Sequence, residues 1–316
     1  MTVPYVVAIS VLLGLLLFLY REVRRPPGPR QWGRTPKWPK RFRIALVTIP
    51  VLLACMFFWG ILIEPARLLV RHETIHINSW PKELDGLRIV AISDIHVGSP
   101  FIDDKKLRSI VERTNQLQPD LIVILGDYIT GDGWLRQQVH PEDFAPSLRG
   151  FNAPLGVYSV LGNHDWWYNG QRVRRALEKN ELKVLDEEVV ELKGRGKPLW
   201  LVGLADLWTR PQRIEDTFAK VPQDATVIAI GHNPDIFPRL PKRVSLMIAG
   251  HTHGGQVKLP LLGRPVESSH VGEHYAAGHV FENDHHLFVT TGIGTSIASI
   301  RFGVPPEIVL LTIRPQ

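Results

Sequence analysis

Short apolar runs that each end in glycine, aspartate, asparagine or histidine dominate the sequence from Leu84 onward. Runs of this length are typical of buried strands, and helical stretches at about 103–117 and 170–180 alternate with the first of them. Because helical patterns become rare after residue 220, we expect two packed mixed sheets flanked by helices rather than one doubly wound sheet. Five runs close on polar motifs, which are Asp94-Ile-His96, Gly126-Asp127, Gly162-Asn163-His164-Asp165, Gly231-His232 and Gly250-His251-Thr252-His253.

These motifs predict a metal centre along one edge of a sheet. The glycine before a ligand permits tight backbone geometry, and alternate residues of an extended Asp-x-His or His-x-His segment point the same way. Two divalent ions need a bridging carboxylate and terminal ligands on each side. We assign one ion to Asp94, His96 and His253, the other to Asn163, His232 and His251, and the bridge to Asp127. A cage of imidazole and oxygen ligands without thiolate suits Mn, Fe or Zn.

In this order, the five motifs resemble the calcineurin-like metallophosphoesterase superfamily over roughly residues 84–316. The resemblance implies an α/β fold with four αββα layers, a dinuclear centre with the ligands above, and metal-dependent hydrolysis of phosphoric ester or diphosphate bonds. The segments 250–257 (GHTHGGQV) and 292–313 resemble the bacterial membrane-associated branch. That branch includes phosphodiesterases and enzymes that split UDP-2,3-diacylglucosamine in lipid A biosynthesis.

The sequence favours an enzyme, because no ligand of the resembled pattern is missing. The leading hypothesis is hydrolysis of a phosphodiester or pyrophosphate bond in a lipid-linked or nucleotide-linked substrate. A broad phosphomonoesterase and a non-catalytic membrane scaffold are the alternatives. Asp127 is followed by Tyr-Ile-Thr, without the Asp and Arg of protein Ser/Thr phosphatases, which disfavours a phosphoprotein substrate. We expect His164 to donate a proton to the leaving oxygen or stabilise the transition state, and Asp165 to orient it or its loop.

Residues near the motifs are candidates for substrate contacts. Trp166 and Trp167 follow the Asn-His-Asp motif, and we expect them to line the substrate pocket or approach lipid headgroups, with packing under the next helix as the alternative. Arg301 is a candidate phosphate contact, with a surface ion pair as its alternative. The run 259–262 (LPLL) is either an exposed apolar lip suited to acyl chains or a turn in the core.

Two uncharged runs, 4–20 and 44–63, each have about the length needed to cross ~30 Å of hydrocarbon as a helix. We therefore predict a membrane anchor over 1–63 with two transmembrane helices, followed by a linker over 64–83. Buried core helices are the alternative. Between the runs, residues 21–43 carry nine lysines and arginines.

The charge distribution indicates which partners are expected and on which side of the membrane the catalytic domain lies. The net charge is +6, but residues 1–63 alone carry +8, which leaves −2 for the remainder. A basic face for nucleic acid is therefore not indicated. Because basic residues in short loops stay in the cytoplasm, we predict a multi-pass protein of the bacterial cell membrane whose catalytic domain is extracytoplasmic. A lipid A precursor made in the cytosol would require the opposite orientation.

Overall fold

The computed structural model describes residues 14, 17, 21, 40–131, 139–194, 196–265, 269 and 272–316. The chain forms two compact units, Met1–Ile63 and Glu64–Gln316. In the first unit, α2 spans Lys40–Phe58 and continues as a π-helix over Trp59–Ile63. No helix in these described ranges combines the length and the apolarity needed to cross a membrane. The predicted span 4–20 lies outside the described residues apart from single positions.

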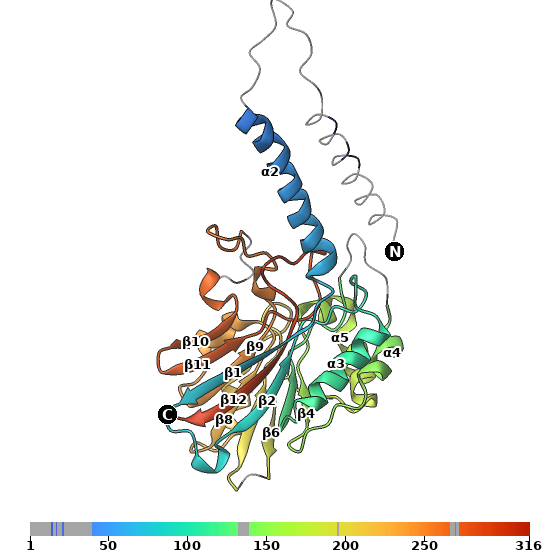
Figure 1. Cartoon of the computed structure of the whole chain (residues 1–316). Helices are drawn as coiled ribbons and strands as arrows, with labels where there is room; N and C mark the ends of the chain where they lie inside the picture. Colours follow the sequence, from blue (N-terminus) through green and yellow to red (C-terminus); the bar gives the residue numbers. More distant parts are fainter. Residues whose placement is uncertain are drawn as a thin grey trace, which may run out of the picture. The chain divides into compact units, whose positions relative to one another are not determined.

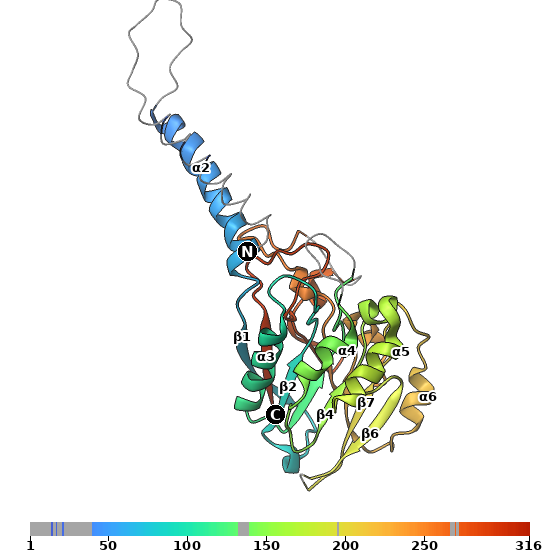
Figure 2. The same cartoon turned by 90° about the vertical axis from the view of Figure 1, so that its right-hand side faces the viewer.

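The second unit contains two six-stranded mixed sheets, as predicted (Figures 1 and 2). The first sheet consists, in spatial order, of β1 (Leu69–Ile77), β12 (Glu307–Pro315), β2 (Leu87–Ile92), β3 (Leu121–Ile124), β4 (Val157–Ser159) and β5 (Lys183–Val184). The second consists of β10 (Gly278–Glu282), β11 (His285–Val289), β9 (Val244–Ala249), β8 (Thr226–Ile230), β7 (Leu199–Gly203) and β6 (Glu188–Leu192).

Helices cover the outer faces of both sheets. On the first sheet lie α3 (Asp104–Gln116), α4 (Pro141–Phe144) and α5 (Asn163–Lys179), and on the second lie α6 (Ile214–Ala219) and a 3-10 helix (Pro234–Arg239). The remaining 3-10 turns are Lys82–Leu84, Ala145–Leu148, His253–Gly255 and Gly272–Tyr275. Apolar clusters lie between the helices and each sheet, and a further apolar cluster fills the space between the two sheets. This cluster contains buried residues from both sheets, such as Ile89 and Ile228. The layers therefore follow the order helix, sheet, sheet, helix.

Two elements differ from the expectations. Residues 64–83 are not a linker throughout, because β1 pairs in parallel with β12 from Leu69 to Ile77. Its polar residues alternate with buried Ile75 and Ile77, so the strand carries only a short apolar signal. The helix expected at about 170 begins earlier, at Asn163, and leaves helical geometry at Asn169. The helix expected at 103–117 is confirmed, and Asp103 caps it by accepting from the backbone N–H of Lys106.

Candidate metal centre

Five strands end at one edge of the two sheets, and each delivers predicted ligands there. β2 leads to Asp94 and His96, β3 to Asp127, β4 to Asn163, β8 to His232, and β9 to His251 and His253. All seven side chains are buried. Carboxyl ends of parallel strands meet at one edge, which explains how residues so distant in sequence come together.

The first group of candidate ligands contains Asp94, His96 and His253. The Nε2 atom of His253 lies 3.3 Å from Oδ1 of Asp94 and 3.0 Å from Nε2 of His96. Among the residues that the structure describes, Oδ1 of Asp94 has no hydrogen-bond partner although it is buried. A buried carboxylate oxygen without a donor is costly, and a cation at this position would compensate it.

The second group lies on the other side of Asp127. The Nε2 atom of His232 lies 3.2 Å from Oδ2 of Asp127, and equally 3.2 Å from Oδ1 of Asn163 and Nδ1 of His251. The same Oδ2 lies 3.7 Å from Nε2 of His96 in the first group. Asp127 is thus the carboxylate that approaches both groups, as a bridging ligand must.

Two histidines are held in the tautomer that a metal requires. Nδ1 of His96 lies 3.2 Å from the carbonyl oxygen of Ile129, and Nδ1 of His232 lies 2.7 Å from that of Leu125. A carbonyl oxygen only accepts, so each Nδ1 carries a hydrogen and each Nε2 faces the cluster as the atom that would bind a metal. Backbone carbonyls fix ligand histidines in this way in metalloproteins.

Burial and neighbouring charges perturb the pKa values of the cluster. Burial raises the pKa of Asp94 to about 6, although His232 opposes the rise. Burial disfavours the charged form of His232, yet the carboxylate of Asp127 outweighs it and raises the pKa of His232 to about 10. The pKa of Asp127 lies well below its usual range, because His232 and the neighbouring imidazoles overcome the effect of burial. Without a cation, a proton on His232 therefore offsets the charge of Asp127, and a metal ion would displace that proton.

The ligand motifs are not extended segments, in contrast to our expectation. Asp94 and His96 have φ values of 53° and 48°, and His251 and His253 have 71° and 51°. These values lie in the left-handed region, which non-glycine residues rarely occupy and which is enriched at functional sites. A sharp turn at the end of each strand, rather than strand alternation, therefore directs both ligands of a motif toward the cluster.

The glycines before the ligands provide close backbone approach, as predicted. A Cβ at Gly162 would lie 2.3 Å from Oδ1 of Asp127, and one at Gly250 would lie 1.8 Å from Oγ of Ser93. Neither distance is compatible with a side chain.

His164 lies at the open side of the cluster. Its Nε2 is 4.0 Å from Oδ2 of Asp127 and 3.3 Å from Oγ of Ser296, and its backbone N–H donates to Oδ1 of Asp127. Its side chain is 14% exposed, whereas the seven candidate ligands are buried. This position suits a group that contacts a substrate.

Asp165, which we expected to orient His164 or its loop, contacts the backbone around Asp127 and Gly162. It is buried and accepts from four backbone N–H groups, those of Asp127, Gly162, Tyr128 and Ile129. Its carboxylate therefore holds the turn that carries Asp127 to the start of α5, which makes it a positioning residue.

The predicted substrate contacts divide into one that reaches the site and two that do not. Trp167 is exposed, and its ring centroid lies 4.9 Å from that of His164. Trp166 packs against the apolar core beneath the guanidinium of Arg210, which lies 4.4 Å from its ring centroid. Arg301 is fully buried and donates to the carbonyls of Gly294, Thr291 and Val304, with Nη2 3.2 Å from Nδ1 of His253. Arg301 therefore supports a ligand loop and does not face a phosphate.

Trp208, which no sequence motif indicated, is half-exposed and lies against His251 with ring centroids 4.4 Å apart. It also stacks on Trp167, with centroids 6.4 Å apart. Buried Asp206, at the end of the run after β7, holds the turn by accepting from the backbone N–H of Trp208. The run ending in Gly-Leu-Ala-Asp was visible in the sequence, but it carries no ligand and therefore gave no reason to select the tryptophan.

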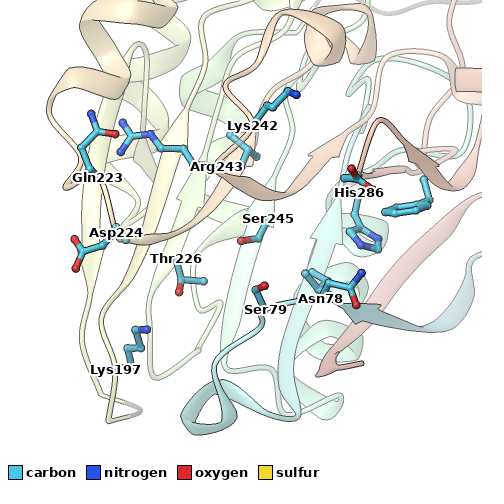
Figure 3. Close-up of a pocket in the computed structure, with 15 residues that line it drawn as sticks. Asn78, Ser79, Lys197, Gln223, Asp224, Thr226, Lys242, Arg243, Ser245 and His286 are labelled. Atoms are coloured by element: carbon cyan, nitrogen blue, oxygen red, sulfur yellow. The ribbon is translucent and has the colours of Figure 1, made fainter.

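A separate cavity of about 500 Å³ lies at the opposite edge of the sheets, and Figure 3 shows its lining. Thr226 and Val244, the first residues of β8 and β9, line it together with His286 and the basic residue Lys242. No residue of the metal cluster lines this cavity, so the candidate chemistry belongs to the other edge.

Comparisons with known proteins agree with this geometry. The pattern of the calcineurin-like phosphoesterases matches residues 87–255. "Uncharacterized metallophosphoesterase YkuE" of Bacillus subtilis is 30% identical over 255 residues, which cover 80% of this chain and 87% of that protein. "Phosphodiesterase YaeI" of Escherichia coli is 27% identical, and the match covers 77% of this chain and 87% of that protein. "Transmembrane protein with metallophosphoesterase domain" of Danio rerio is 28% identical, covering 82% of this chain and 59% of that protein.

Proposed function

Because the chain belongs to the calcineurin-like phosphoesterase family, we propose that it is a dinuclear-metal hydrolase of a phosphodiester or pyrophosphate bond. The observation that carries the proposal is the position of Asp127, whose Oδ2 lies within 4 Å of Nε2 of both His96 and His232. Asp94, His96 and His253 would hold one ion, and Asn163, His232 and His251 the other.

The bound ions would activate a water molecule and neutralise charge on the phosphoryl oxygens. The protein's own contribution is to fix the ligands, since backbone carbonyls orient His96 and His232 and Asp165 holds the turn of Asp127. His164 would donate a proton to the leaving oxygen, and its partly exposed ring beside the cluster supports this role.

The substrate class is proposed on two grounds. A phosphodiester substrate is supported by the name of one relative, the phosphodiesterase YaeI of Escherichia coli. Membrane anchoring through 4–20 and 44–63, with a lipid-linked substrate, is supported by the uncharged runs in the sequence and by the name of the zebrafish relative. UDP-2,3-diacylglucosamine therefore belongs in a substrate panel together with simpler diesters.

The test is hydrolysis by the purified full chain in detergent. We expect bis(4-nitrophenyl) phosphate to be cleaved with added Mn²⁺ and not in excess chelator, and the metal content to approach two ions per chain. 4-Nitrophenyl phosphate serves as the comparison, and its faster cleavage would favour a phosphomonoesterase. Full activity in chelator would contradict the metal mechanism, and a chain that binds no metal would favour a scaffold.

A further inference from the structure

Three apolar side chains beside the metal centre are almost fully exposed. Leu261 and Leu262 belong to the hairpin 257–263, and Ile297 belongs to the loop 295–299. Their exposed fractions are 106%, 79% and 87%. Together these three residues are called the apolar rim below. Single exposed leucines are ordinary, but a group that gathers at one functional edge marks an interaction surface.

The backbone of the rim is unfavourable for the residues it carries. Leu261 has a φ of 67° and Ile297 a φ of 57°, in the left-handed region that glycine or asparagine normally occupies. For a β-branched residue such as isoleucine this conformation is a genuine outlier. Folding thus gains nothing from an apolar residue at either position, since the side chain is both strained and in water. Such outliers point to a role outside the folded core.

The rim is joined to the candidate site by hydrogen bonds. Nε2 of Gln256, directly before the hairpin, donates to the carbonyl oxygens of Ser296 and Ala298, and its Oε1 accepts from the backbone N–H of Ser296. Oγ of Ser296 lies 3.3 Å from Nε2 of His164. The hairpin and the loop therefore form one unit whose base touches the candidate proton donor.

The chain also enters the domain at this edge. β12 is antiparallel to β2, and β1 is parallel to β12, so β1 begins at the edge where β2 ends. Buried Glu64, just before β1, accepts from the backbone N–H of Val304 in the segment that follows the loop. The second unit therefore begins, at Glu64, at the edge that carries the metal centre and the rim, and in sequence it follows the uncharged run 44–63.

We propose that the apolar rim docks on the lipid bilayer and holds the metal centre over phosphoesters that remain in the membrane. Leucine and isoleucine side chains would enter the boundary between headgroups and acyl chains, with exposed Lys258 at the base of the hairpin near anionic headgroups. Exposed Trp167 and Trp208 at the same opening are residues favoured at that boundary. This inference rests on the proposed function and specifies its substrate as an amphiphile presented by the bilayer.

The direct test places a fluorescent probe on the rim. The full chain with Cys55→Ala and Leu261→Cys, labelled with an environment-sensitive dye, is reconstituted in phosphatidylcholine–phosphatidylglycerol vesicles that contain spin-labelled lipid. The control carries the dye at Phe281→Cys, because Phe281 is a half-exposed apolar residue on β10 that lines the cavity at the opposite edge. We expect several-fold stronger quenching at 261 than at 281. Equal quenching at the two positions would overturn the proposal. A dye signal at position 261 that rises only as the ratio of protein to lipid increases would also overturn it, because that would indicate contact with a second copy of the chain.

A second measurement separates docking from catalysis. In vesicles, Leu261→Ser, Leu262→Ser and Ile297→Ser together should lower cleavage of a vesicle-embedded phosphodiester about tenfold and leave cleavage of soluble bis(4-nitrophenyl) phosphate unchanged. Phe281→Ser should change neither rate. Equal loss on both substrates would contradict docking. Absence of soluble diester cleavage in the unmodified chain would instead contradict the proposed function, whatever the dye reports.

Discussion

Among single residues, Asp127 has the largest predicted role, because one oxygen of its carboxylate approaches imidazoles of both groups of candidate ligands. Asp127→Asn keeps the size of the side chain but removes the charge that would bridge two cations. We expect turnover to fall by roughly 10³-fold or more and metal content to drop, with a larger loss than for any other single ligand. Asn163→Ala, which removes a ligand of one ion only, is the comparison. Equal losses in the two variants, by metal analysis and rate, would argue against a bridge.

His164 is predicted to act on the leaving group rather than on the metals. His164→Ala should lower turnover by about 10²–10⁴-fold while the metal content stays intact. Because 4-nitrophenolate leaves without needing a proton, the loss should be smaller for bis(4-nitrophenyl) phosphate than for an alkyl diester. A variant that loses its metal would identify His164 as a ligand, and equal losses on both substrates would exclude proton donation.

Other residues show why side-chain roles were harder to predict than ligand identity. Arg301 was selected for its charge, yet its guanidinium is buried among carbonyl oxygens and supports the His253 loop. Trp166 and Trp167 are neighbours in sequence, but only Trp167 is turned outward toward His164. Direction and burial depend on tertiary packing, which a local motif does not contain.

At the level of elements, the ends of the strands explain how the site is built, and their glycines offer a matched comparison. Gly162 and Gly231 each precede a candidate ligand. A Cβ at Gly162 would meet Asp127 at 2.3 Å, whereas one at Gly231 would meet only the flexible end of Met247 at 3.2 Å. We expect Gly162→Ala to weaken metal binding by about 10–100-fold and Gly231→Ala to have a much smaller effect. Metal titration of both variants checks this. Equal affinities would show that the loop of Asp127 can shift to make room for the added methyl group.

β10 and β11 carry a pair of histidines whose contact predicts a pH effect on stability. Nε2 of His279 lies 2.9 Å from Nδ1 of His286, and the rings stack. Burial and the neighbouring histidines lower the pKa of His286 to about 4. Between about pH 6.5 and pH 4 the unfolded chain therefore binds a proton that the folded chain does not. The free energy of unfolding should fall as the pH drops through this window, and this group should cause no further loss below it.

Urea unfolding from pH 7 to pH 4 measures this slope, and His286→Gln should make it shallower. An unchanged slope in the variant would assign the acid sensitivity to other groups. The pair lies at the edge of the second sheet, away from the candidate ligands, so the effect can be read without reference to metal binding.

For the whole molecule, the sequence was sufficient to predict two mixed sheets flanked by helices, because buried strands such as β2 and β3 are continuous apolar runs. It was also sufficient to name residues that come together at one edge. It did not predict the edge strand β1, whose alternating polar residues resemble a linker, or the left-handed turns at Asp94 and His251. Those features follow from pairing and close packing between distant segments, and no local pattern encodes them.

The orientation of the whole chain is the last prediction. The loop 21–43 carries nine basic residues, whereas 64–83 carries only Arg67, Arg71 and Lys82. If 4–20 and 44–63 span the membrane, this bias keeps the loop in the cytoplasm and the domain outside it. Fusions to Gln316 in a bacterial host test this, since Gln316 follows β12 at the edge opposite the rim and leaves the docking surface accessible. Both fusions carry Asp127→Asn, so that phosphoester hydrolysis by the chain itself does not add to the measured alkaline phosphatase activity. We expect an alkaline phosphatase fusion to be active and a green fluorescent protein fusion to be dark. A bright fusion would reverse the orientation and direct the search for lipid-borne substrates to the cytoplasmic leaflet.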